Sequence, residues 1–166
     1  VFEELRPEIL NRGEITLPEG KLFGRWKLGM FPGQSECTNK YKPVKSQSRK
    51  GFQHLQNGNV RGAFDEFSEI YNVGESSWTV FPMIYDPQSY SVMDSNATCA
   101  LAVLGRTCKS APKWENRPNE GYIDHYDEWN NRLNRIATAT GLSLRDVDRA
   151  LWTIGKLDKK CGCNSP

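Results

Sequence analysis

The chain is 166 residues long, 37% of its residues are hydrophobic, and its formal net charge at pH 7 is +2. This length supports one hydrophobic core, so we expect a single domain over residues 1–166, and the small net charge excludes any inference of nucleic-acid binding from the chain as a whole. No apolar run approaches the roughly 18 to 20 residues that a membrane helix needs, so we expect no membrane partner.

The five cysteines show no regular spacing, and three of them lie far from the pair Cys161 and Cys163. This pattern predicts no disulfide framework and favours a reducing compartment, so we expect an intracellular protein, in the cytoplasm, nucleoid or nucleus. Zinc usually takes about four ligands, so neither this pair nor the isolated His54 and His125 predicts a metal site. No cofactor is expected.

The first third of the chain is predicted to be mostly irregular. Apolar residues in Phe2–Asn11 follow a helical spacing, which predicts a short helix with Pro7 tolerated only near its first turn. From residue 12 to residue 51, glycine and proline recur too often for any period to last. Within this segment only Leu22–Leu28 is a candidate for a short extended piece. A loop of about 40 residues is unusual in a compact domain and indicates function or mobility.

The end of this irregular segment is basic. Its five cations, with no acid among them, are Lys40, Lys42, Lys45, Arg49 and Lys50. Tyr41 lies among them, and Phe52 and His54 follow closely. Such a patch can face the phosphates of a nucleic acid. A solvated basic loop without a partner is the alternative interpretation.

A tight turn between two helices is predicted next. The apolar residues of Asn59–Tyr71 share one helical face, which we expect to be core. This face is Val60, Ala63, Phe64, Phe67 and Ile70. An asparagine and a glycine in Ile70–Gly74 can adopt positive φ, so this run can turn sharply into a second helix over Ser76–Tyr85. The backbone N–H groups of Val73–Ser77 can then bind a phosphate, although many such turns contact nothing.

Asp94 lies at the start of the following predicted helix. Asp94 or Ser95 is expected to cap this helix. Its expected inward face is Ala97, Ala100, Leu101 and Leu104. An aspartate in this position is often an ordinary N-cap that stabilises a helix by about 1 kcal/mol with no catalysis implied.

Two long helices, within residues 122–157, are predicted to close the chain after a loop at 107–121. Tyr122–Thr140 has apolar residues at steps of three and four and ends at Gly141. Ser143 is expected to cap the last helix, with Asp146 forming a near capping box. The expected buried stripe of this helix is Val147, Ala150, Leu151 and Ile154, with Trp152 outside it.

Three runs between Ile70 and Arg106 have the order and spacing of a known motif. They are Ile70-Tyr71-Asn72-Val73-Gly74, Val92-Met93-Asp94-Ser95-Asn96 and Leu104-Gly105-Arg106. These runs resemble the helix-hairpin-helix DNA glycosylases, whose hairpin reads roughly Leu-Pro-Gly-Val-Gly and whose catalytic aspartate lies in a Val-Asp-Thr-His-Val run. The resemblance covers only this part of the chain.

The resemblance implies a mainly α fold, a helical bundle of DNA-glycosylase type with the hairpin and the aspartate in segment 59–106. It implies DNA as the partner, hydrolysis of the bond to a modified or mismatched base, and Asp94 as the catalytic residue. The DNA-binding residues of the hairpin would be Asn72, Val73, Gly74, Ser76 and Ser77. Ser76 occupies the position of the Schiff-base lysine of the lyase members, so no lyase activity is expected. Pro82 should kink the second helix.

A flipped base needs an aromatic pocket. The main candidates are Trp78, Tyr85 and His54, with Trp26 and Trp152 also available, and each is more often plain core. Some members of the family carry an iron–sulfur cluster on four cysteines after the last helix, and only two are present here, so no cluster is expected. Two alternatives stay open: a non-catalytic module that binds DNA or protein through the hairpin, and a helical interaction protein unrelated to DNA.

Overall fold

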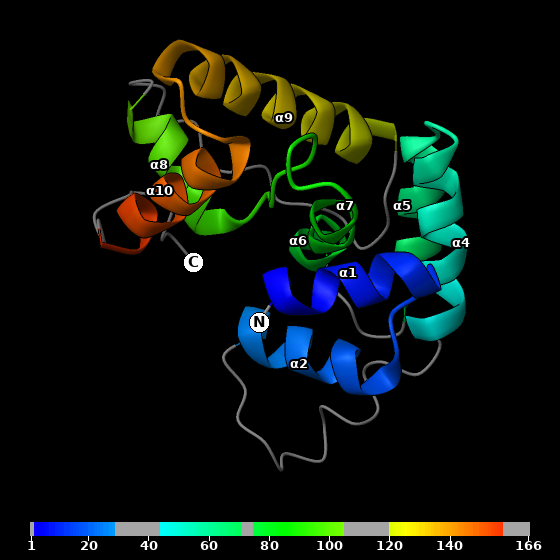
Figure 1. Ribbon diagram of the computed structural model, residues 1–166. Helices are drawn as coiled ribbons and strands as arrows, with labels where there is room; N and C mark the ends of the chain where they lie inside the picture. The colour runs from blue at the N-terminus through cyan, green and yellow to red at the C-terminus, as the bar shows by residue number, and fades with distance from the viewer. Residues whose placement is uncertain (1, 29–43, 71–74, 105–119, 158–166) are drawn as a thin grey trace, which may run out of the picture.

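The computed structural model describes residues 2–28, 44–70, 75–104 and 120–157, a few side chains at the ends of these ranges excepted. All regular secondary structure in these ranges is α-helical, which confirms the predicted mainly α class (Figure 1). None of the described helices is both long and apolar enough to cross a membrane.

The N-terminal helix α1 (Phe2–Arg12) confirms the helix predicted at this end of the chain. It ends at Gly13, which adopts a positive φ of 71°. The N–H of Gly13 donates to the carbonyl of Ile9 at 2.8 Å, closing the last turn.

The second helix, α2 (Leu17–Leu28), shows that the loop predicted for segment 12–51 was wrong over these residues, including the extended piece Leu22–Leu28. Residues 29–43 of that segment lie outside the described residues. Glu19 fixes the start of α2, because its carboxylate accepts hydrogen bonds from the N–H and the hydroxyl of Thr16, both at 2.7 Å. The proline and glycines that indicated a loop are compatible with the helix. Proline is tolerated in a first turn, and glycine costs only about 1 kcal/mol in a helix.

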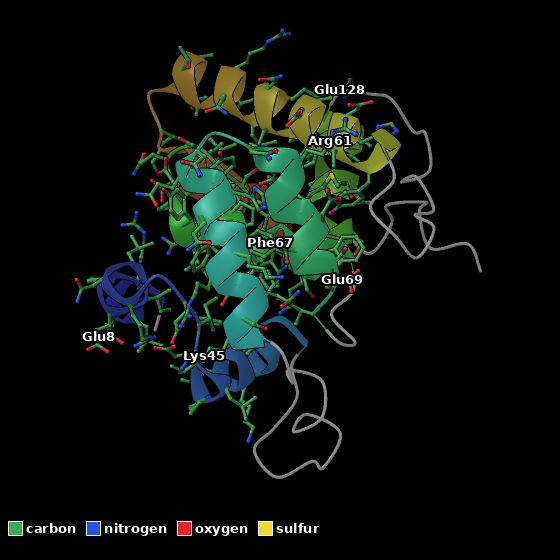
Figure 2. The ribbon with its side chains drawn as sticks, turned by 90° about the vertical axis from the view of Figure 1, so that its right-hand side faces the viewer. Glu8, Lys45, Arg61, Phe67, Glu69 and Glu128 are labelled. Atoms are coloured by element: carbon green, nitrogen blue, oxygen red, sulfur yellow. The ribbon has the colours of Figure 1, made fainter. Side chains whose placement is uncertain are left out.

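The helix α4 (Val44–Gln56) also begins inside the segment predicted to be irregular. Gly51 lies in its middle, and a Cβ at this position would come within 2.1 Å of Cε1 of Phe67. This glycine therefore allows α4 to approach the next helix closely instead of ending a helix. Figure 2 shows the two helices side by side, with Phe67 in the region where they meet.

The next helix, α5 (Val60–Ser68), confirms the helix predicted over residues 59–71, with a slightly earlier end. Asn59 caps it, because its Oδ1 accepts a hydrogen bond from the N–H of Gly62 at 2.9 Å. The predicted core face is buried, except that Val60 is only half-buried.

Two short helices, α6 (Glu75–Trp78) and α7 (Val80–Tyr85), replace the single helix predicted over Ser76–Tyr85. The break falls at Thr79, and the kink expected at Pro82 is therefore misplaced. Pro82 lies in the first turn of α7, where a missing N–H is tolerated.

Aromatic rings fill the core between these helices and the long helix α9 (Glu120–Thr140). Phe67 stacks on Phe81 with 4.8 Å between ring centroids, and Phe64 lies 4.9 Å from Tyr126. All four rings are buried. The helices around α6 and α7 thus share one cluster of buried hydrophobic side chains.

The remaining helices are α8 (Ser95–Leu104) and α10 (Leu144–Leu157), which pack mainly against each other beside α9 (Figure 1). Gly141 ends α9 with a positive φ of 72°, as predicted. Ser143 caps α10, as predicted: its Oγ accepts from the N–H of Asp146 at 3.1 Å and donates to the Asp146 carboxylate at 2.6 Å.

The predicted inward faces of α8 and α10 were partly wrong. Leu104 is 61% exposed, and Ala150 and Ile154 are also exposed. In α10 the buried stripe is Leu144, Val147, Asp148 and Leu151. The charged residue Asp148 thus belongs to the buried stripe, which is rotated toward it from the predicted one. Trp152 lies outside the stripe, as predicted.

Cys99 in α8 is disulfide-bonded, and the other four cysteines of the chain lie outside the described residues. The irregular spacing of the cysteines predicted no disulfide framework. Because disulfides persist mainly in oxidising environments, the cysteines no longer favour a reducing compartment.

Candidate functional site

Asp94 is the N-cap of α8. Its Oδ1 accepts a hydrogen bond from the N–H of Ala97 at 2.9 Å, and its carbonyl accepts from the N–H of Thr98 at 2.9 Å. The side chain is half-buried. The capping alternative is therefore confirmed, and because one aspartate can cap a helix and also act in catalysis, this finding leaves the catalytic hypothesis untested.

The segment that leads into Asp94 is fixed by two side chains. The N–H and hydroxyl of Ser91 donate to Oδ1 of Asn130 in α9, at 3.0 and 2.6 Å. The N–H of Met93 donates to Oγ1 of Thr79, at the break between α6 and α7, at 3.1 Å. All four residues are buried, so these bonds satisfy backbone groups that water cannot reach.

The carboxylate of Asp148 accepts a third backbone hydrogen bond, from Val92. Asp148 is only 3% exposed and pairs with Arg145, with 2.5 Å between Oδ2 and Nη1. Burial raises the pKa of Asp148 to about 6, although Arg145 opposes this shift, and the charge of Asp94 contributes to it. Asp94 and Asp148 are therefore neighbours that share one electrostatic environment.

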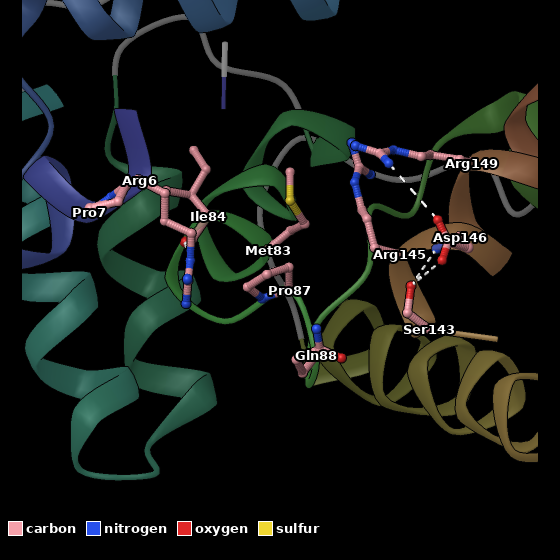
Figure 3. Close-up of a pocket in the computed structure, with 10 residues that line it drawn as sticks. All are labelled: Arg6, Pro7, Met83, Ile84, Pro87, Gln88, Ser143, Arg145, Asp146 and Arg149. Atoms are coloured by element: carbon pink, nitrogen blue, oxygen red, sulfur yellow. Dashed lines mark hydrogen bonds and ion pairs between the residues drawn. The ribbon is translucent and has the colours of Figure 1, made fainter. Parts of the chain in front are cut away.

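A pocket of about 420 Å³ adjoins this cluster, between α1, α7 and the start of α10 (Figure 3). Three arginines line it, namely Arg6, Arg145 and Arg149. Arg145 belongs both to the pocket and to the ion pair with Asp148, whereas Asp94 does not line the pocket.

The predicted hairpin falls mostly outside the described residues. Asn72, Val73 and Gly74 lie in the undescribed range 71–74, and the side chain of Ser76 is also undescribed. Ser77 is half-buried in α6. The predicted phosphate-binding role of the hairpin therefore stays a prediction.

The predicted basic patch is described only in part. Lys40 and Lys42 lie outside the described residues. Lys45 and Arg49 both pair with Glu14, and Lys50 pairs with a second carboxylate on α5.

Glu14 is the buried partner of this patch. Burial raises the pKa of Glu14, but the bonds and charges of Arg49 and Lys45 outweigh it, so the net pKa is lower than usual. Lys50 pairs with Glu66 at 3.3 Å. The three cations are more than half exposed, so they can still meet a phosphate, but two carboxylates offset much of their charge.

The candidate base-pocket residues that the structure describes each lie beside different residues. Trp78 is buried and packs edge-on against a tyrosine of α9, which is core packing. Tyr85 is half-buried beside a phenylalanine of α4. His54 lies 3.2 Å from the amide of an asparagine. Trp152 is exposed, with a lysine over its ring, and the side chain of Trp26 is not described.

Sequence reasoning missed the residues that surround Asp94 and the pocket. These are Arg6, Thr79, Asn130, Arg145, Asp148 and Arg149. Asp148 carried the clearest signal, because Leu144, Asp148 and Leu151 have the spacing of a buried stripe and a charged residue on such a stripe needs a partner. Asn130 and Thr79 have no comparable signal.

No group of three or more His, Cys, Asp or Glu side chains in the described part of the chain is arranged to hold a metal ion. Comparison with protein-family models, with curated proteins and with solved structures finds no match for this chain.

Proposed function

We propose that this protein binds DNA and hydrolyses the N-glycosidic bond of a modified or mismatched base, with Asp94 as its catalytic carboxylate. The setting of Asp94 carries the proposal. Its side chain is half-buried at the start of α8, and each of the three residues before it is held by a backbone hydrogen bond to a side chain from another part of the chain.

Loss of a base leaves positive charge on the sugar as the glycosidic bond breaks. A carboxylate near C1′ stabilises this charge and can orient or deprotonate the attacking water. Electrostatic stabilisation is most effective when the charged group is already in place before the reaction. The fixed segment from Ser91 to Met93 would hold Asp94 in this way, whereas an N-cap alone does not require such anchoring.

Ser76 determines the expected type of reaction. The lyase members of the helix-hairpin-helix DNA glycosylases, which this chain resembles, use a lysine amine as nucleophile at the corresponding position. Serine cannot form a Schiff base. We therefore propose hydrolysis by water, without cleavage of the DNA strand.

The test is base release from duplexes that carry uracil, oxidised purines, alkylated bases or hypermodified cytosines. Asp94→Asn should lose base release from any duplex that the native protein processes, while its DNA affinity changes by less than about twofold. Asparagine is as good an N-cap as aspartate, so the variant keeps its α8 cap. Asp86→Asn, at the C-terminal end of α7, is the matched control and should keep activity. Undiminished base release by Asp94→Asn would contradict the proposed role.

A non-catalytic DNA-binding or protein-interaction module is the second candidate, and the capping bonds of Asp94 favour it, because they account for an aspartate at this position without chemistry. Binding of undamaged duplex that weakens steeply with salt, with no base release from any substrate, would support the DNA-binding form. Absence of duplex binding even at low salt would leave a protein-interaction module.

A further inference from the structure

The pocket between α1, α7 and α10 is lined by residues that have no part in the proposed catalysis by Asp94. Asp94 is absent from its lining, whereas three guanidinium groups from two distant segments of the chain surround it. We propose that this pocket binds the phosphate monoester of a ligand of nucleotide size. This inference goes beyond base hydrolysis and does not depend on it.

The arginines supply the anion-binding part of the pocket. In Figure 3, Arg6 extends from α1 on one side, while Arg145 and Arg149 extend from α10 on the other. Arginine binds phosphate through planar, charge-assisted hydrogen bonds, which are about twice as strong as neutral ones. Guanidinium groups on opposite sides of one cavity are suited to grip a phosphate between them.

Arg6 is held rigidly before any ligand arrives. Its Nε donates to the carbonyl of Ile84 at 3.0 Å, and its Nη2 donates to the carbonyl of Tyr85 at 2.9 Å. These carbonyls lie in the last turn of α7, so they fix the guanidinium without cancelling its charge. A guanidinium has about five N–H donors, so these two bonds leave others for a ligand.

The other part of the pocket is apolar. Its apolar lining residues are Pro7, Met83, Ile84 and Pro87. Met83 and Ile84 are buried in the core, so this wall is firmly supported. The volume of about 420 Å³ lies within the range of roughly 300–1,000 Å³ that is usual for small-molecule sites. A ligand with one phosphate and a flat ring that packs its face on this wall fits both parts, and a nucleoside monophosphate has these two features.

Two carboxylates reduce the positive charge of the pocket. Asp146 lines it and lies 3.9 Å from Nη1 of Arg149, and Asp148 pairs with Arg145 behind the lining. Three arginines against two aspartates leave one positive charge. A phosphate must therefore compete with Asp146 for Arg149, which gives the proposal a specific consequence: removal of the Asp146 charge should tighten binding.

The experiment is calorimetric titration of the full chain with thymidine monophosphate, thymidine and inorganic phosphate. We expect the monophosphate to bind at least about tenfold more tightly than thymidine, because only the monophosphate can engage the arginines. It should also bind more tightly than inorganic phosphate, because the apolar wall holds the nucleoside. Equal affinity for thymidine and its monophosphate would overturn the proposal.

Arg149→Gln should weaken monophosphate binding by about fivefold or more. Arg132→Gln is the matched control, because Arg132 is 56% exposed in its side chain against 52% for Arg149 and also pairs with an acid on its own helix. Asp146→Asn should strengthen binding, and asparagine can still accept the hydrogen bond from Ser143. Equal losses in Arg149→Gln and Arg132→Gln, or no gain in Asp146→Asn, would contradict the assignment.

A further titration distinguishes two ligands that carry the same phosphate group. A free mononucleotide and the 5′-phosphorylated end of a DNA strand both present a phosphate monoester on a nucleoside. A phosphorylated oligonucleotide that binds no better than its unphosphorylated form, while thymidine monophosphate binds, identifies the free mononucleotide as the ligand. Asp94→Asn should leave all these affinities unchanged, so failure of the base-release proposal would not affect this test.

Discussion

Asp148 lies close to Asp94, where α10 packs against the start of α8. Asp148 is buried, and its pKa is raised to about 6 mainly by this burial and in part by the charge of Asp94. Its carboxylate also accepts the N–H of Val92, two residues before Asp94. One buried acid thus holds the backbone that presents the candidate catalytic residue and shares the electrostatic field around it.

The first prediction concerns stability and pH. In the unfolded chain Asp148 has its ordinary pKa of 3.8, so between about pH 4 and pH 6 the folded protein retains a proton that the unfolded chain releases. The contribution of this group to stability is therefore greatest below about pH 4 and is lost as the pH rises through 6. Asp148→Asn does not titrate, so its free energy of unfolding should rise relative to the native protein by on the order of 2 kcal/mol from pH 4 to pH 7.

Urea denaturation of both proteins at several pH values measures this difference. The comparison is made between two curves, so other groups that titrate equally in both proteins cancel. If the difference in the free energy of unfolding between the two proteins stays constant from pH 4 to pH 7, Asp148 has an ordinary pKa and the prediction is wrong.

The second prediction concerns Asn130. Asn130→Ala removes the acceptor of two buried donors of Ser91, which should cost about 2–3 kcal/mol in the free energy of unfolding. Asn134→Ala is the control one turn further along α9, because Asn134 is exposed and its side chain only donates to a backbone carbonyl. Its cost should be below about 0.5 kcal/mol. Similar losses in the two variants would contradict the anchoring role of Asn130.

The sequence predicted the helices that have one continuous apolar face. α5 and α9 were predicted nearly to their ends, because Phe64 and Phe67, or Tyr126 and Leu133, recur at helical spacing on a buried side. The cap at Ser143 is local and follows from residue type, so the start of α10 was also predicted correctly.

The helices α2 and α4 were missed because their glycines, and the proline of α2, indicate a loop by residue type alone. Gly51 packs against Phe67, which lies in another helix, so nothing within α4 reveals why a glycine is needed there. Glu19 fixes the start of α2 through Thr16, which a count of prolines and glycines does not detect.

The surroundings of Asp94 were missed for a similar reason. Asp94 itself was found through its position before a helix and through the family resemblance. Asn130 and Asp148 come from other helices, and their bonds to Ser91 and Val92 exist only after α9 and α10 have packed. Contacts between segments so far apart leave no periodic signal in a single sequence.

The third prediction concerns the disulfide of Cys99. Cys99→Ser should lower the free energy of unfolding by roughly 2–4 kcal/mol, because the cross-link no longer restricts the unfolded chain. A thermal melt with dithiothreitol should lower the Tm of the native protein and leave that of Cys99→Ser nearly unchanged. Peptide mapping without reduction would identify the partner cysteine. Equal sensitivity of both proteins to dithiothreitol would contradict a stabilising role for this disulfide.

The fourth prediction concerns the packing of α8 against α10. A Cβ at Gly155 would lie 1.9 Å from the carbonyl oxygen of Asn96, in the first turn of α8. Backbone cannot rotate away as a side chain can, so Gly155→Ala should push the two helices apart and cost about 1–3 kcal/mol. Because Asn96 is two residues from Asp94, the same change should disturb the candidate site.

Gly62→Ala is the matched control, since Gly62 also lies inside a helix. The nearest groups to its added Cβ are the side-chain ends of Asn59 and His54, which can move. Alanine is favoured over glycine in a helix by about 1 kcal/mol, and the shift of the Asn59 cap of α5 costs about as much, so this variant should be close to neutral in urea denaturation. If Gly155→Ala were also neutral, α8 and α10 would have to be further apart than the structure shows, and the effect of the Asp94 charge on Asp148 would be in doubt as well.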